Sequence, residues 1–149
     1  MKKFLSLLII IIFCGGLTFI SSTSPSVQAN NRYYKINHQL AQELSEHQSY
    51  ANSDPGNYDY AKFIKSIKYV GNHKVIVYVN HGFANMNKTD KNSIMQQVNA
   101  LIKMVLQSNN QNFVGKGNRK LLIIIKNGHT KIGQSTQANS QTYKWKSVK

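Results

Sequence analysis

The chain has 149 residues and a formal net charge of +14 at pH 7, because 19 Lys and Arg stand against 5 Asp and Glu. It contains one cysteine, which excludes an intramolecular disulfide framework and a zinc site built from several cysteines. The five Asp and Glu residues also offer few candidates for the pair of carboxylic acids that a hydrolase uses in acid–base catalysis.

The first 29 residues have the three parts of a secretory signal peptide. Two lysines follow the initiating Met, residues 4–20 are almost all apolar, and Val27 and Ala29 fit cleavage before Asn30. The Ser and Pro residues between the apolar run and this site predict that the helix ends there and that the cleavage site is extended. The sequence therefore predicts an exported protein with a signal peptide over residues 1–29.

Two other readings of the same segment stay open. The apolar run of about 17 residues reaches the lower limit of a bilayer span, so an uncleaved signal would act as a membrane anchor. Lipid attachment at Cys14 is the second alternative, although Phe13 stands where lipoprotein processing requires a small residue. Cleavage before Asn30 would leave residues 30–149 as a single small basic domain without cysteine. Loss of Lys2 and Lys3 lowers the charge of that domain from +14 to +12.

The domain begins with a predicted helix and a predicted loop. Residues 33–47 predict a helix, and residues 53–57 (Ser-Asp-Pro-Gly-Asn) predict a loop. Apolar or aromatic side chains recur along the helix at three- and four-residue steps, which indicates one buried stripe: Tyr33, Ile36, Leu40, Leu44 and His47.

A β-hairpin is predicted next, from residues 63–70 and 74–80. Gly71, Asn72 and His73 separate the two runs, and Gly and Asn tolerate the positive φ of a tight turn. In the second run, one face consists of valines and is predicted to be core: Val75, Val77 and Val79. The other face alternates with it: Lys74, Ile76, Tyr78 and Asn80.

The strongest predicted helix follows, capped by Asn87 and ending at Ser108. Asp90 lies in its first turn, where a negative charge is favourable. Its apolar face is predicted to be core: Ile94, Val98, Leu101, Ile102, Val105 and Leu106. Its polar face is predicted to meet water: Lys91, Gln97 and Lys103.

Residues 121–125 are five aliphatic residues and predict a strand buried on both faces, with weaker strands at 130–135 and 142–146. This order predicts a two-layer α+β fold, with one long helix packed on a small antiparallel or mixed sheet and a short N-terminal helix. The second face of the sheet would need cover from the first helix or from a partner.

The predicted elements also support a resemblance. Residues 37–44, residues 60–64 with 67–69, Gly82-Phe83 ahead of Asp90-Lys91, and residues 132–135 with 143–145 give a pattern over nearly all of the exported domain. This pattern resembles a family of small secreted proteins of lactic-acid and related Gram-positive bacteria, to which no activity is attached. A shorter loop at residues 53–57 and a more basic balance depart from the family. The resemblance implies export and one domain, and it supplies no functional residue.

No catalytic, cofactor or metal motif is found. The histidines lack the i, i+4 spacing that places two metal ligands on one helix face, and no Gly-x-Ser-x-Gly sequence is present. Residues 115–120 form a glycine-rich basic loop, but the loop precedes a strand and not a helix, which is the reverse of a P-loop. We therefore predict a protein that is not an enzyme and needs no cofactor.

The basic surplus is the feature that most suggests a function. An exported domain of this charge attracts anionic polymers, such as wall teichoic acid, phospholipid head groups or released DNA. The predicted contacts combine three clusters of basic residues with one aromatic residue that would stack on bases or sugars: Lys62, Lys65, Lys68, Lys116, Arg119, Lys120, Lys144, Trp145 and Lys146.

Two alternatives to this function stay open. The first is a secreted effector or inhibitor that binds another protein through Ile76 and Tyr78 on the second sheet face. The second is a basic surface that only keeps the protein soluble and reflects codon bias.

Overall fold

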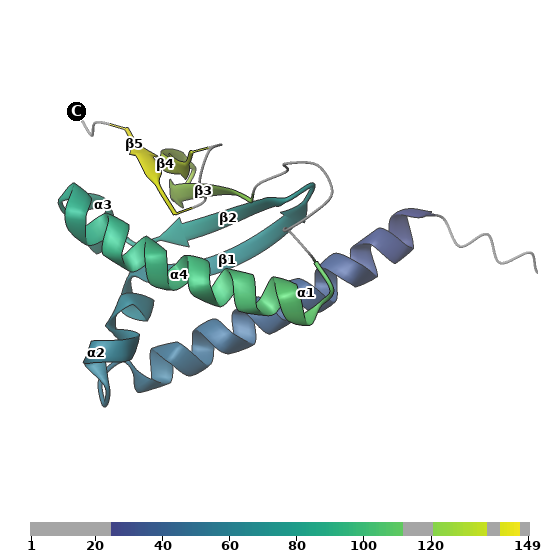
Figure 1. The fold of residues 1–149 in the computed structure, drawn as a ribbon, viewed down its shortest axis with the longest axis horizontal. Coiled ribbons are helices and arrows are strands. Elements are labelled where there is room, and N and C mark those ends of the chain that lie inside the picture. Colours follow the sequence, from purple (N-terminus) through teal and green to yellow (C-terminus); the bar gives the residue numbers. More distant parts are fainter. Residues whose placement is uncertain (1–24, 112–120, 137–140, 147–149) are drawn as a thin grey trace, which may run out of the picture.

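The computed structural model describes residues 25–111, 121–136 and 141–146 (Figure 1). Helices and strands follow one another in the order α1 (Pro25–Tyr50), α2 (Pro55–Tyr58), 3-10 helix η1 (Asp59–Phe63), β1 (Ile64–Gly71), β2 (Lys74–Val79), α3 (His81–Asn85), α4 (Lys88–Ser108), β3 (Leu122–Asn127), β4 (Thr130–Ser135) and β5 (Tyr143–Trp145).

The five strands form one sheet in the order β1-β2-β3-β4-β5. β2 and β3 are parallel, and α4 lies between them in the chain, so α4 is the crossover that parallel strands require. The other three neighbouring pairs are antiparallel. The predicted α+β fold is therefore confirmed, and its sheet is mixed.

The turn between β1 and β2 has the predicted backbone. Gly71, Asn72 and His73 have φ values of 83°, 49° and 56°, so the two central residues both take the positive φ of a tight hairpin turn. Gly71 has a second constraint, because a Cβ there would lie 2.4 Å from the Tyr33 hydroxyl oxygen. The first turn of the sheet is thus fitted against α1.

The first helix is longer than predicted at both ends. It begins at Pro25, so the backbone is helical through the predicted cleavage site and not extended there. Proline at the first helical position needs no hydrogen-bond partner for its nitrogen, which makes this start favourable. Similarly, the predicted loop at residues 53–57 is partly helical, because Pro55 begins the single turn of α2.

α4 has the predicted cap and core face, with one exception. Asn87 Oδ1 accepts a hydrogen bond from the backbone N–H of Asp90 at 2.9 Å, and all six predicted core residues are buried. Lys91 was expected to meet water, but its side chain is buried and its Nζ donates to the Ala84 carbonyl at 2.8 Å. Helix α3, which the sequence analysis missed, supplies that carbonyl and removes Lys91 from solvent.

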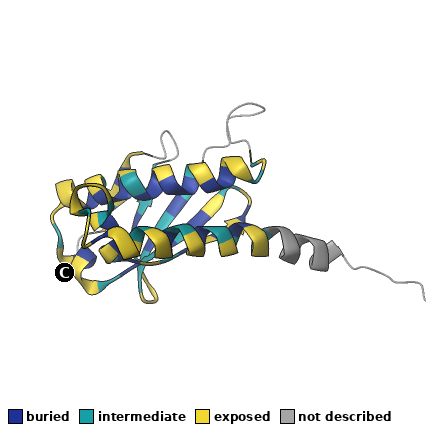
Figure 2. Ribbon diagram, turned by 90° about the horizontal axis from the view of Figure 1, so that it is seen from below, coloured by how far each residue is buried: buried dark blue, intermediate teal, exposed yellow. Residues whose placement is uncertain are grey.

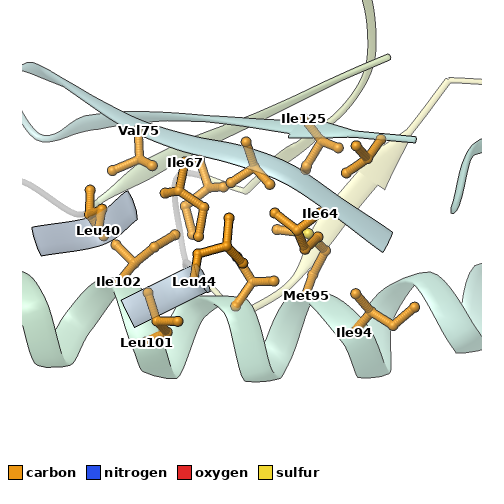
Figure 3. Packing of buried hydrophobic residues seen from close by; sticks show 14 of the residues in the cluster. Leu40, Leu44, Ile64, Ile67, Val75, Ile94, Met95, Leu101, Ile102 and Ile125 are labelled. Carbon is orange, nitrogen blue, oxygen red and sulfur yellow. The ribbon is translucent and has the colours of Figure 1, made fainter. Parts of the chain in front are cut away.

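Both long helices cover the same face of the sheet. α1 packs against β1 and against α4, and Figure 2 shows the two helices side by side with the strands behind them. The core lies between these layers (Figure 3). Leu40 and Leu44 of α1 join Leu101 of α4 and the inward residues Val75 and Ile125 in one buried cluster.

The first helix therefore does not cover the second face of the sheet, and within the described residues the predicted burial of both faces of residues 121–125 is wrong. In β3, Ile123 and Ile125 are buried, whereas Leu122 and Ile124 on the other side are half-exposed. α1 could not reach that side because it is fixed to the edge of β1. The Asn37 amide nitrogen donates to the Tyr69 carbonyl at 3.0 Å, and Asn37 Oδ1 accepts from the Tyr69 N–H at 2.7 Å.

These two hydrogen bonds occupy the backbone groups of Tyr69 that a further strand could use, so α1 protects this part of the edge of β1. Within the described ranges, no helix has the length and apolar character needed to cross a membrane.

Candidate functional site

The functional candidate is the side of the sheet that no described helix covers, and we call it the open face. Its members follow from side-chain alternation and from the register of the four strand pairs. All are exposed or half-exposed: Ser66, Lys68, Lys74, Ile76, Tyr78, Leu122, Ile124, Lys126, Lys131, Gln134 and Lys144.

Three cross-strand pairs on the open face join a lysine to an apolar or aromatic residue. Lys68 is the cross-strand partner of Ile76, Lys74 of Leu122, and Lys126 of Tyr78. Directly paired side chains lie about 5 Å apart on the same face of a sheet. Each of these apolar side chains therefore has a lysine side chain beside it.

No acidic residue lies on the open face. The five Asp and Glu residues of the chain are Glu43, Glu46, Asp54, Asp59 and Asp90, and all of them lie on helices or in the connection before α2. In the described part of the chain, the one ion pair joins Lys62 to Asp59 at 2.8 Å, on η1. The five open-face lysines thus form an unneutralised positive surface.

Two lysines of the open face make local contacts. Lys68 Nζ lies 5.9 Å from the centre of the Tyr78 ring, within the range of a cation–π interaction. Lys131 Nζ donates a hydrogen bond to Gln134 Oε1. Neither contact neutralises a charge, so both ammonium groups remain available to an anion.

The predicted basic contacts are only partly brought together. Lys68 and Lys144 lie on the open face, at its two edge strands. Lys62 is paired with Asp59, Lys65 is exposed at an irregularity of β1, and Lys146 is exposed after β5. The remaining three predicted contacts lie outside the described residues: Lys116, Arg119 and Lys120.

Trp145 belongs to the helical side of the sheet and not to the open face. Its indole Nε1 donates to Asn92 Oδ1 of α4 at 2.9 Å, and its ring stacks on Tyr143 with centroids 5.7 Å apart. The ring also covers Gly133, where a Cβ would lie 2.5 Å from a ring carbon. One side of the Trp145 ring lies against β4, and its N–H is hydrogen-bonded to Asn92. Trp145 therefore packs within the protein, and we assign stacking on a ligand to another residue.

Sequence reasoning missed several members of the open face: Ser66, Leu122, Ile124, Lys126, Lys131 and Gln134. Alternation within β2 separated Lys74, Ile76 and Tyr78 from the core. It could not supply the β3 and β4 residues, because the parallel register that joins Tyr78 to Lys126 depends on a contact between strands far apart in the sequence.

A second aromatic cluster joins α1 to η1. His47 Nδ1 forms a hydrogen bond with the Tyr60 hydroxyl, and the His47 ring makes an edge contact with Tyr58 at 4.8 Å between centroids. Burial raises the pKa of the Tyr60 hydroxyl above its usual value of 10, and the charges of Tyr58 and Glu43 act in the same direction. The hydroxyl therefore stays protonated, and the cluster has a structural role in fixing the end of α1.

No group of three His, Cys, Asp or Glu side chains gathers in the described residues in a way that could hold a metal ion. The resemblance to small secreted Gram-positive proteins stays a prediction. No family model matches the chain, and comparison with curated proteins and with solved structures likewise gives no match.

Proposed function

We propose that this is a secreted, non-enzymatic binding protein that associates through the open face with linear phosphate polymers outside the cell, either cell-envelope polymers or nucleic acid. The observation that supports the proposal is the presence of five lysines and no carboxylate on that one uncovered surface. Export rests on the signal-peptide pattern of residues 1–29.

The driving force is the release of counterions from the polymer. Each phosphate that a lysine neutralises releases condensed cations, and binding to a single strand weakens with salt by a log–log slope of about −0.7 per contact. Five contacts therefore give a slope of about −3.5. A steep dependence on salt is the signature of this mode of binding.

We expect Lys126→Gln combined with Lys131→Gln to weaken binding and to reduce the salt slope by about 1.4, because two of the five contacts are lost. The measurement is a titration of the protein with teichoic acid and with DNA, at salt concentrations from roughly 50 to 200 mM. The protein is used in the form recovered from the producing culture.

The matched control is Lys35→Gln combined with Lys88→Gln, which removes the same charge from exposed positions on α1 and α4. Its salt slope should stay close to that of the parent. Equal effects of the two pairs would show that binding follows net charge and not the open face. Absence of binding to either polymer at the lowest salt would refute the proposed function.

A protein partner is the second candidate, and the half-exposed Ile76, Tyr78, Leu122 and Ile124 favour it. An apolar contact depends little on salt, whereas screening weakens exposed charge contacts. The salt titration therefore separates the two functions, since a protein partner would be retained at high salt and lost on Ile76→Ser.

A further inference from the structure

The arrangement of apolar and basic residues on the open face points to a more specific ligand. We infer that the open face binds single-stranded nucleic acid, with bases against Tyr78 and its apolar neighbours and phosphates on the lysines. This inference rests on the proposed function and narrows it to one kind of phosphate polymer.

The first argument is the spacing of the side chains on the open face. Neighbouring strands lie about 4.8 Å apart, and same-face positions recur along a strand at about 6.6 Å. The pairs Lys68–Ile76, Lys74–Leu122 and Tyr78–Lys126 each place a lysine beside an apolar or aromatic residue, over three strands. A ligand that fits must offer charged and flat apolar groups at similarly short intervals, as a nucleic acid strand with accessible bases does.

The second argument is the position of Tyr78. It lies on β2, inside the sheet and not at its edge, and its ring is half-exposed. Its cross-strand partner on β1 is Ser66, the smallest side chain on the open face, and Lys126 is its partner on β3. The tyrosine ring thus has Ser66 and Lys68 on the β1 side, with Lys68 Nζ 5.9 Å from the ring centre, and Lys126 on the β3 side. Cations beside an aromatic ring suit a stacked base with its phosphate.

Other ligands that contain phosphate would contact fewer kinds of side chain on the open face. A polyol-phosphate polymer has no planar ring for Tyr78, and a duplex keeps its bases stacked inside and offers mainly phosphates. A membrane would take up the apolar side chains only by drawing in the lysines interleaved with them, whereas membrane-surface elements separate the two kinds of residue. Single strands are the ligand that uses both.

The test compares ligands of equal charge. Oligothymidylate of about 12 nucleotides, within the usual range of site sizes, is titrated beside an abasic oligomer with the same backbone. A DNA duplex, poly(glycerol phosphate) and anionic phospholipid vesicles complete the series. We expect oligothymidylate to bind about fivefold or more tightly than the abasic oligomer, because stacking of one base is worth at least about that factor.

Tyr78→Leu should remove this preference and leave binding of the abasic oligomer unchanged. Tyr78→Phe keeps the ring and should keep the preference, and Tyr34→Leu changes an exposed tyrosine on α1 as a control. If Tyr78→Leu does not fold, the parent protein and Tyr78→Phe still give the comparison between the two oligomers.

Equal binding of the two oligomers by the parent would overturn the inference and leave the proposed function intact. A preference for the duplex, the polyol phosphate or the vesicles would overturn it in the same way. Loss of affinity in Tyr34→Leu equal to that in Tyr78→Leu would remove the assignment to the open face. Failure to bind any of the phosphate ligands would refute both proposals.

Discussion

Lys91 and Trp145 show how single residues near the end of the sheet are placed by their neighbours. Lys91 Nζ lies 5.7 Å from the centre of the Trp145 ring and donates to the Ala84 carbonyl. A buried ammonium group is tolerated only where such partners replace water. Both residues looked available for surface contacts in the sequence, and both are part of the packing between α4, α3 and β5.

Gly133 is the residue that makes the position of Trp145 possible. We expect Gly133→Ala to lower the free energy of unfolding by about 1–3 kcal/mol, because the added methyl group would overlap the indole ring. Fluorescence of Trp145, the one tryptophan in the chain, should report the displacement directly.

Gly56→Ala is the control for Gly133→Ala, since a Cβ at that position in α2 meets no atom within 4 Å. Its stability should be unchanged or raised by up to about 1 kcal/mol, because alanine restricts the unfolded chain. A melt of Gly133→Ala that coincides with that of the parent would show that Trp145 does not lie against β4.

At the scale of elements, α4 is the helix that completes the core. We expect Leu101→Asp to lower the free energy of unfolding by about 3–5 kcal/mol, because it buries a charge without a partner. Leu101 is 3% exposed and lies with Leu44 of α1 between the helices and the sheet (Figure 3). Urea denaturation of the variant and the parent measures the difference.

Met104→Asp is the matched control on the same helix, because Met104 is 46% exposed. A surface substitution of this kind should change the free energy of unfolding by less than about 0.5 kcal/mol. Similar losses in the two variants would contradict the assigned orientation of α4.

The position of α1 along the edge strand β1 is also determined by contacts between elements. Asn37 of α1 occupies the backbone groups of Tyr69, and the Gln48 side chain donates to the Ile64 carbonyl at 2.8 Å. These polar contacts hold α1 along β1 and leave the open face clear. The sequence predicted the apolar stripe of α1, but it did not show that polar residues beside the stripe determine where the helix lies.

At the scale of the whole molecule, the function proposed here depends on export. We expect the mature protein to begin at Asn30, because Val27 and Ala29 satisfy the cleavage rule. N-terminal sequencing of material from the culture medium gives the answer, and a start at Met1 or a lipid-modified Cys14 would contradict it.

The sequence by itself determined the local features of this protein. Asn87 at the start of α4, the positive φ values at the β1–β2 turn and the alternation of valines in β2 each depend on residues a few positions apart. The hydrophobic period was strong enough to give the α+β class and the core of α4, since burial of a regular stripe needs no knowledge of the partner.

Only the tertiary structure decided which face of the sheet the described helices leave open. That outcome depends on α1 and α4 lying on one side of the sheet, and on the parallel pairing of β2 with β3. It brings Lys68, Tyr78 and Lys126 together although about 60 positions of sequence separate the first from the last. Contacts between residues so far apart depend on which packing arrangement of the whole chain is most stable. The local sequence pattern does not predict that arrangement.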